Sequence, residues 1–410
     1  MATPSISDGL EPAPGPSPQA LIAVLTATSI LGMLGSSSFA ALLPEFESLW
    51  GLSNTEAGWI SALFFAGYVV AVPVLVGSTD HVDPRRIYLS SLILGGAASA
   101  AYALLAQGFW SAAVIRVFAG MGLAGTYMPG LKLLTDRYSG PRQSRYIAYY
   151  TAGFSFGTAF SYAFTGEVAE WFGWRVAFLG AAAGSLAALA LIALLVPPAP
   201  SAPAGGVALN RLAFRPVFRN RAAMAFVLGY VGHTFELFAL RAWLNAYLVY
   251  ADRTHGGSGD ISQASWISTA TVLISTVASI YGAEVAAHAD RRWIIGRVMI
   301  LSVLGSAAAG FGSVLPVWAV ALLCCGYSML IMADSAALTA GAVISSPQAQ
   351  RGATLAVHSL LGFSGAVLGP LAVGVVLDAV GGEASYLAWG FAFLTMGAGS
   401  FAALFAIRRL

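Results

Sequence analysis

Charged residues are scarce in this sequence of 410 residues. Asp, Glu, Lys and Arg together make up 9% of the chain, whereas 58% of its residues are hydrophobic and the mean hydropathy is +0.77. Soluble domains carry about a quarter charged residues and need polar side chains to cover their surface. The shortage of charge therefore excludes an ordinary soluble domain and indicates a polytopic membrane protein.

Other features are missing as well. The formal net charge is +2, so no large basic surface suggests nucleic acid. The two cysteines, Cys324 and Cys325, are adjacent, which indicates neither a disulfide scaffold nor a metal site. No G-x-x-x-x-G-K-[ST] loop for a nucleotide occurs. The five histidines are scattered, which disfavours a membrane enzyme. We expect no metal, no cofactor and no enzymatic activity.

Twelve segments are apolar and long enough to cross a bilayer. A spanning helix needs about 20 mostly apolar residues. The predicted spans are 20–43, 55–76, 87–106, 109–132, 146–166, 173–196, 222–249, 264–286, 293–314, 317–342, 352–378 and 386–407. The sequence thus predicts an all-α membrane protein with twelve transmembrane helices.

The basic residues lie mostly on one side of these spans. Because the number of spans is even, both termini lie on the same side, and this side carries sixteen of the twenty Lys and Arg residues. Arg175 and Arg253 fall on the other side, and Arg116 and Arg241 fall within spans. Cytoplasmic loops are enriched in Lys and Arg. We therefore expect a multi-pass protein of the plasma (inner) membrane with both termini in the cytoplasm.

A Pro- and Gly-rich stretch that turns basic divides the spans into two sets of six. It reads PPAPSAPAGGVALNRLAFRPVFRNR over residues 197–221, a composition typical of a linker. Residues 1–19 contain no Lys or Arg, which argues against a signal peptide and for a disordered cytoplasmic tail. The expected domains are an N-terminal bundle over 20–196 and a C-terminal bundle over 222–410, joined by a cytoplasmic linker.

The two sets of spans are related to each other. A shift of 207 residues superposes GWIS (58–61) on SWIS (265–268) and Asp83 on Asp290, and further matches follow in order. Two parallel repeats of this kind are a known plan of transporters, with the substrate site at their interface near the membrane midplane.

Four stretches resemble motifs of the major facilitator superfamily. GSTDHVDPRR (77–86) is similar to G-x-L-A-D-R-x-G-R-R/K, although Asp80 falls one residue early and a proline replaces the second glycine. RVFAGMGLAG (116–125) matches an R-x-x-x-G-x-G core, and FGWRVAF (172–178) opens the sixth span as in many members. GAVLGPLAVG (365–374) has the small-residue pattern of close helix packing.

The resemblance implies two pseudo-symmetric six-helix bundles that alternate access to a central cavity. It also implies a cytoplasmic gating motif, whose charged loops lock neighbouring helices and exchange partners as the halves move. The residues of this motif are Gly77, Asp80, Asp83, Arg85, Arg86, Asp290, Arg291 and Arg292. A plain positively charged loop is the alternative for residues 77–86.

One departure from the family pattern bears on the substrate. Drug antiporters of this superfamily that use protons carry G-x-x-x-G-P-x-x-G-G on the fifth span. The corresponding stretch here is GFSFGTAFS (153–161), which lacks the Gly-Pro pair. The difference lowers the weight of a drug-antiporter interpretation without excluding it.

Ionisable side chains inside the predicted spans indicate a functional site, because burying charge in a membrane is costly. The candidates for substrate binding or proton coupling are Arg116, Tyr127, His233, Glu236, Arg241 and Asp334. A guanidinium fork matches a carboxylate, whereas histidine and buried acids take up protons. Two alternatives stay open. Glu236 and Arg241 form a structural network, or the two acids balance the arginines and leave the site neutral.

The expected function is secondary transport of a small organic anion or similar solute, coupled to protons and carried out by a monomer in the lipid bilayer. The runner-up is proton-driven efflux of amphipathic drugs or metabolites. Intact arginines within the spans favour the first, whereas a Gly-Pro pair on the fifth span would have favoured the second. A sensor that resembles a transporter is the remaining alternative.

Overall fold

The computed structural model describes residues 17–79, 81–138, 142–198 and 214–408, which form helices joined by short turns with no strand among them. Most of the predicted tail, Asp80 of the predicted gating motif and the middle of the predicted linker lie outside this part of the chain. The all-helical membrane fold predicted from the sequence is confirmed.

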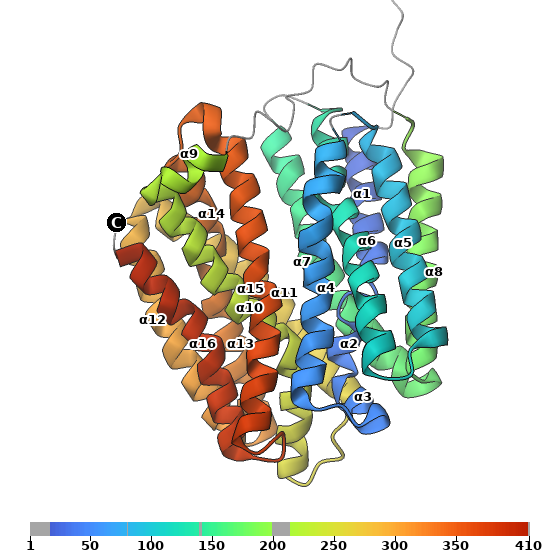
Figure 1. Cartoon of the computed structure of the whole chain (residues 1–410), viewed down its shortest axis with the longest axis vertical. Helices are drawn as coiled ribbons and strands as arrows, with labels where there is room; N and C mark the ends of the chain where they lie inside the picture. The colour runs from blue at the N-terminus through green and yellow to red at the C-terminus, as the bar shows by residue number, and fades with distance from the viewer. Residues whose placement is uncertain (1–16, 80, 139–141, 199–213, 409–410) are drawn as a thin grey trace, which may run out of the picture.

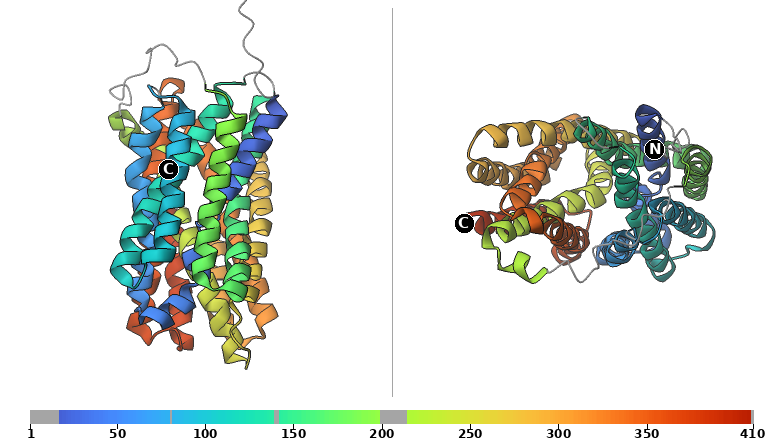
Figure 2. Two further views of the ribbon diagram at one scale, coloured as in Figure 1. Left: turned by 90° about the vertical axis from the view of Figure 1, so that its right-hand side faces the viewer. Right: turned by 90° about the horizontal axis from the view of Figure 1, so that it is seen from above.

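The helices form two groups that stand side by side (Figures 1 and 2). The first group contains α1 (Pro18–Gly32), α2 (Ser38–Ala41), α3 (Leu43–Trp50), α4 (Asn54–Ser78), α5 (Pro84–Leu105), α6 (Phe109–Thr135), α7 (Gln143–Phe172) and α8 (Trp174–Leu195). The second contains α9 (Phe214–Arg219), α10 (Arg221–Thr254), α11 (Ile261–His288), α12 (Arg291–Gly310), η2 (Phe311–Val314), α13 (Val317–Ala333), α14 (Ser335–Ile344), η3 (Gln348–Gln350), α15 (Arg351–Val380) and α16 (Tyr386–Arg408).

Ten helical segments of the described residues are long and apolar enough to cross a membrane. Two of them combine consecutive helices, α12 with η2 and α13 with α14. The remaining two predicted spans correspond to α7, which has 30 residues, and to the broken series α1, α2 and α3. The structure therefore supports the twelve predicted spans in position, while ten of them meet the criterion of length and apolarity.

The first span is broken, although the sequence predicted one helix over 20–43. Helix α1 ends at Gly32 and α2 begins at Ser38, so residues 33–37 leave the regular helix. This segment contains Gly35, Ser36 and Ser37, residue types that favour non-helical backbone. The break frees the carbonyls of Leu34, Gly35 and Ser36 to accept hydrogen bonds from other helices.

Glycines let the helices of each group approach closely. A Cβ atom at Gly120 of α6 would lie 1.8 Å from the carbonyl oxygen of Phe64 of α4. A Cβ atom at Gly369 of α15 would lie 2.2 Å from the carbonyl oxygen of Phe235 of α10. Because apolar area alone does not drive helix association in a bilayer, such backbone contacts stabilise each group.

The internal repeat predicted from the sequence is visible in the helix caps. Asp83 accepts a hydrogen bond from the backbone N–H of Arg85 (2.9 Å) at the start of α5. Asp290 accepts one from the backbone N–H of Arg292 (2.9 Å) at the start of α12. The same Asp-x-Arg sequence thus caps the third span of each half.

The two halves meet mainly at one end. We call the end that holds the start of α1 and the end of α16 the terminal side and the opposite end the far side (Figure 1). On the far side Asp378 of α15 accepts hydrogen bonds from the backbone N–H groups of Asn54 (3.1 Å) and Thr55 (2.8 Å) of α4. Their side chains also donate to Asp378. A carboxylate of one half therefore caps a helix of the other.

A second contact on the far side joins α7 and α11. Glu167 of α7 accepts hydrogen bonds from Ser262 (2.9 Å) and Trp266 (2.6 Å) of α11. Nearer the centre, Thr269 of α11 donates to the backbone carbonyl of Ala159 of α7 (3.0 Å). These pairs of helices are equivalent in the two repeats, so the far side is closed by two related contacts.

Candidate functional site

A pocket lies where the two halves meet, and it contains two of the predicted site residues. It leaves about 470 Å³ free of protein atoms, part of it open to solvent. Its lining residues are Ser36, Ser37, Ala40, Ser61, Phe64, Phe65, Arg116, Leu123, Phe154, Thr158, Tyr162, Phe238, Arg241 and Ala242. Both arginines belong to this lining, whereas none of these residues is acidic.

Arg116 of α6 approaches the break in the first span. Its Nη1 atom lies 3.4 Å from the carbonyl oxygen of Gly35, and its Nη2 atom lies 3.3 Å from that of Ser36. The guanidinium carbon also lies 4.1 Å from the ring centroid of Phe64. The side chain is 4% exposed, and its Nε–H has no partner. Two long bonds to carbonyls leave hydrogen-bonding capacity for an anion.

Arg241 comes from α10 of the other half. Its guanidinium carbon lies 5.6 Å from the ring centroid of Phe238, and its backbone carbonyl accepts a hydrogen bond from Tyr162 of α7. Within the described ranges neither Arg241 nor Arg116 forms a salt bridge. The pocket therefore presents two cations without a protein carboxylate between them.

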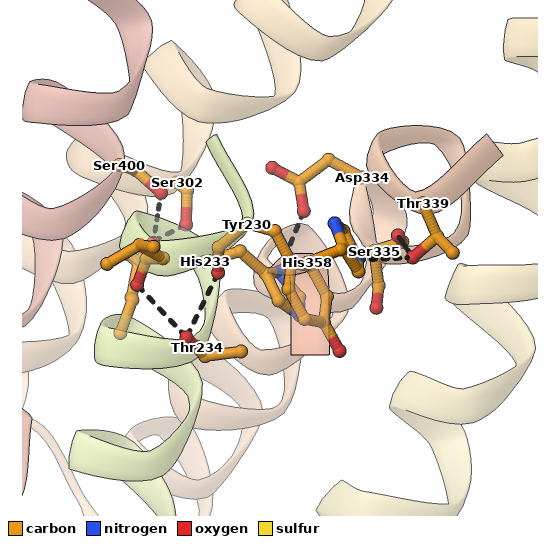
Figure 3. A network of polar contacts seen from close by, with 11 residues as sticks. Tyr230, His233, Thr234, Ser302, Asp334, Ser335, Thr339, His358 and Ser400 are labelled. Carbon is orange, nitrogen blue, oxygen red and sulfur yellow. Dashed lines mark hydrogen bonds and ion pairs between the residues drawn. The ribbon is translucent and has the colours of Figure 1, made fainter. Parts of the chain in front are cut away.

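The three predicted acid and histidine residues lie within the C-terminal half instead. His233 of α10 lies with its Nδ1 atom 2.8 Å from Oδ1 of Asp334 (Figure 3). Asp334 sits between α13 and α14, where the helix is interrupted. The two side chains are 1% and 3% exposed. In a buried pair of this kind, each member stabilises the charged form of the other.

His233 is one of two histidines held by the same tyrosine. The ring of Tyr230 lies 5.3 Å from the imidazole centroid of His233 and 4.0 Å from that of His358 of α15 (Figure 3). His358 Nε2 lies 3.1 Å from the hydroxyl of Thr339. The Nε2 atom of His233 and the Nδ1 atom of His358 are buried without a partner.

Glu236 has a separate environment one turn further along α10. It is 0% exposed and accepts hydrogen bonds from Ser302 of α12 (2.9 Å), Tyr327 of α13 (2.7 Å) and Ser400 of α16. These three hydroxyl donors fix the orientation of the carboxyl group. Glu236 thereby joins four helices of the C-terminal half and does not line the pocket.

Tyr127 is outside the pocket as well. Its ring stacks on that of Tyr150 at 6.0 Å and meets that of Phe154 edge-on at 5.3 Å. Helix α6 continues from Phe109 to Thr135 through Pro129. The tyrosine contributes to the packing of α6 on α7, next to a residue that lines the pocket.

The predicted gating residues lie at the terminal side. Arg85 donates from Nε to the carbonyl of Val196 (2.5 Å) and from Nη2 to that of Ala193 (2.8 Å), so it caps the end of α8. Gly77 lies in the last turn of α4 and Arg86 in the first turn of α5.

The equivalent residues of the second repeat begin α12. Asp290 precedes the helix and accepts hydrogen bonds from its first turn, which contains Arg291 and Arg292. The Nε–H of Arg291 is buried without a partner. Each described gating residue thus occupies the end of a helix on the terminal side.

Sequence reasoning missed several residues that the structure brings to these sites. His358 of the eleventh span was a weaker candidate from the sequence and was not included among the predicted site residues. The hydroxyl groups of Ser36, Ser37 and Thr158 line the pocket, and the run of serines in the first span was their signal. Glu236 and Asp334, which one alternative had balancing the arginines, both lie outside the pocket lining.

Solved structures with this arrangement of helices are membrane transporters. A bacterial homologue of the human lysosomal transporter Spinster, in an inward-facing and occupied conformation, has a TM-score of 0.76 and 16% sequence identity, over 97% of this chain and 96% of that chain. A D-xylose-proton symporter has a TM-score of 0.75 and 15% identity, over 94% and 96% of the two chains. The fold is therefore that of a transporter with two helical bundles.

The sequence profile of the Major Facilitator Superfamily matches residues 25–257. The chain belongs to this superfamily, as the resemblance of its motifs predicted.

Curated relatives match parts of the chain. A probable sphingolipid transporter, spinster homolog 2 of Arabidopsis thaliana, is 28% identical over 161 residues, which are 38% of this chain and 33% of that protein. A chloramphenicol resistance protein of Streptomyces lividans is 29% identical over 275 residues, 65% of this chain and 66% of that protein. A niacin transporter of Acinetobacter baylyi is 24% identical over 146 residues, 36% and 33% of the two chains. The matches thus span between a third and two thirds of these relatives.

Proposed function

We propose that this transporter moves a small organic anion together with protons by alternating access. The observation that carries the proposal is the pocket between the halves, in which Arg116 and Arg241 have no carboxylate partner. Two uncompensated cations in a partly dry site need an anion, and guanidinium groups bind carboxylates with matched geometry.

The rest of the pocket favours an anion with an apolar body. Phe64, Phe65, Phe154, Phe238 and Tyr162 line it, and hydroxyl groups supply its remaining polar atoms. Aromatic walls bind flat or apolar ligands, while a few polar groups fix their orientation. An aromatic or otherwise compact monocarboxylate therefore fits the lining better than a neutral polyol.

The proton is proposed to bind at His233 and Asp334. The pair is buried in the half that also carries Arg241, and histidine is the side chain whose protonation changes in the physiological range. Glu236 is proposed to hold its four helices together. Proton uptake beside α10 and anion binding at α10 give one helix a contact with both transported species.

Relatives and neighbours support both parts of this proposal. One curated relative is a niacin transporter, and niacin is an aromatic carboxylic acid. One structural neighbour is a proton symporter.

A second candidate is proton-driven efflux of an amphipathic compound. It is favoured by the aromatic lining of the pocket and by the relative that confers chloramphenicol resistance. In this case the arginines would contact polar groups of a neutral ligand, and substrate charge would matter little.

Purified protein in liposomes under an imposed pH gradient separates the two candidates. Nicotinate is tested beside its neutral analogue nicotinamide, and chloramphenicol is tested in the same vesicles. We expect accumulation of nicotinate that stops when a protonophore removes the gradient, and none of nicotinamide. Transport of chloramphenicol that persists in Arg241→Gln would contradict the anion proposal and support the second candidate.

The membrane, the orientation and the oligomeric state of the protein are proposed from its sequence. The linker and both termini would lie in the cytoplasm, because the basic residues lie on that side. The membrane would be the plasma (inner) membrane, and each bundle with its linker would act within a single monomer. Labelling of Ser258 on the far side by an impermeant reagent in intact cells, in a cysteine variant, tests this orientation.

A further inference from the structure

Asn245 joins three helices where the two halves meet. Its Nδ2 atom donates to the carbonyl oxygen of Ala41 of α2 (3.1 Å) and to Ser265 of α11 (2.8 Å). Ser268 of α11 donates to its Oδ1 atom (2.5 Å). Asn245, Ser265 and Ser268 are all 0% exposed. A buried amide with this many partners has a fixed orientation, because losing any partner leaves a polar atom unsatisfied.

The carbonyl that Asn245 contacts is available because the first span is broken. Ala41 is the last residue of α2, and the carbonyls at a helix end have no partner within the helix. Asn245 supplies that partner from the opposite half. Among the described residues, this is the one hydrogen bond that joins the segment 33–41 to the C-terminal half.

The N-terminal half holds the same segment from two sides. Ser161 of α7 donates to the carbonyl of Leu34 (2.7 Å) and accepts from the backbone N–H of Ser37 (2.9 Å). From α6, Arg116 contacts the carbonyls of Gly35 and Ser36. The pocket arginine therefore holds the non-helical residues 33–37, and Asn245 holds the short helix α2 that follows them.

We propose that Asn245 is a positioning residue that keeps the far side of the transporter closed by holding the broken first span against the C-terminal half. The bond between Asn245 and Ala41 crosses the boundary between the halves, so it must break when they separate on the far side. An anion that draws Arg116 from Gly35 and Ser36 changes the restraint on the same stretch. This last step rests on the proposed function, whereas the closing role of Asn245 does not.

Distances between spin labels on the far side test the closing role without any substrate. Ser48 of α3 and Ser258 after α10 are exposed and belong to different halves. Cysteines at these two positions carry the labels in a background with Cys324→Ser and Cys325→Ser. Asn245→Leu removes all three hydrogen bonds, but only the bond to Ala41 joins the two halves. We therefore expect the ratio of long to short distances to rise about fivefold, as for the loss of one net hydrogen bond.

Two further variants control for packing and folding. Asn245→Asp keeps the shape of the side chain but cannot donate to Ala41, and it is expected to shift the distances in the same direction. Ser275→Ala is the matched control, because Ser275 is equally buried on α11 but donates to Val272 of its own helix. It is expected to leave the distances unchanged.

Transport measurements then separate this inference from the proposed function. Asn245→Leu is expected to lower the kcat for nicotinate uptake about fivefold while its KM changes less than twofold. The inference would be overturned if Asn245→Asp folds and shows the distance distribution of the wild type. If Asn245→Leu shifts the distance distribution but the wild type does not take up nicotinate, the closing role of Asn245 is kept and the proposed substrate class is rejected.

Discussion

The two halves of the molecule share a fold but carry different buried charges. In the N-terminal half the buried cation is Arg116, which contacts backbone carbonyls and an aromatic ring. In the C-terminal half His233 pairs with Asp334, and Glu236 is held by three hydroxyl groups. The repeat therefore preserves helix ends and packing while the chemistry of the two interiors has diverged.

The difference suggests that anion binding and proton binding take place in different parts of the protein. In the proposed function, the two arginines at the boundary of the halves bind the anion, and the buried groups of the C-terminal half bind the proton. Because His233, Glu236 and Arg241 all lie on α10, this helix contacts both sites. The first predictions below test this separation, and the last one tests the contact between the halves on the far side.

The largest effect is expected for Asp334→Asn. Without the carboxylate His233 loses its buried partner, and breaking such a pair costs about 3–5 kcal/mol. Accumulation of nicotinate against its gradient should fall at least about 100-fold, which corresponds to roughly 2.7 kcal/mol. Exchange of labelled for unlabelled nicotinate should continue.

The control for this variant is Asp136→Asn. Asp136 forms an exposed pair with Lys132 (3.2 Å) at the terminal side. Exposed pairs contribute about 0–1 kcal/mol, so uptake should stay near that of the wild type. Equal loss of accumulation and exchange in Asp334→Asn would mean that the residue supports the fold and not the coupling.

Arg241→Gln should have the next largest effect. Hydrogen bonds to charged groups contribute about 1.5–3 kcal/mol, so the KM for nicotinate should rise about 10- to 100-fold. Arg116→Gln should raise it less, because part of this guanidinium is engaged by the carbonyls of Gly35 and Ser36. Initial rates in liposomes measure both. Arg175→Gln is the control, since Arg175 is exposed and stacks on Trp174.

Glu236→Gln should mainly affect stability. The amide cannot accept all three hydroxyl donors as the carboxylate does, and an unsatisfied buried group costs about 1–3 kcal/mol. A lower midpoint of thermal unfolding in detergent is expected, with an unchanged number of protons moved per nicotinate. Loss of proton movement in Glu236→Gln, but not in Asp334→Asn, would reverse the roles assigned to the two acids.

The smallest effect is expected from a change of pH, which acts on two acidic residues of the far side, Glu47 and Glu383. Burial and then the charge of Glu383 raise the pKa of Glu47 in α3, and burial raises the pKa of Glu383 in the turn before α16. Asp378 adds negative charge nearby, and Arg253 adds positive charge beside Glu383. Because raised pKa values favour the protonated pair, its contribution to the closed state is present at low pH and is lost as the pH rises through these values.

The distance between labels at Ser48 and Ser258 measures this dependence. Raising the pH from about 6 to about 9 should increase the population with long distances. Glu383→Gln should remove most of the change, since the neutral amide does not repel Glu47. A pH response that persists in Glu383→Gln would assign the effect to another group.

Much of the fold was predictable because a bilayer imposes a simple rule on each span. A run of about 20 apolar residues is readable in a single sequence, and the described helices coincide with the predicted spans. The break at residues 33–37 was not predicted, because the rule counts apolar residues and not local hydrogen bonds. Gly35 and the serines after it were the local signal.

The composition of the site was predictable, but its geometry was not. Arg116, His233, Glu236, Arg241 and Asp334 stand out because ionisable groups are rare in spans. Which of them meet depends on helix packing across more than a hundred residues of sequence. Periodicity along α10 places His233 and Glu236 on one face, yet in the structure they bond to different helices.

Helix α4 has two sets of groups that satisfy its first turn. Ser53 and Glu56 form a capping box within the helix itself, and Asp378 adds a cap from the other half. If the far side opens, Asp378 leaves, but the capping box remains, so the start of α4 need not fray. Separation of the halves then costs a few hydrogen bonds that water replaces, and no helix has to refold. Such spare capping would let this side of the transporter open as a rigid unit and close again in the same register.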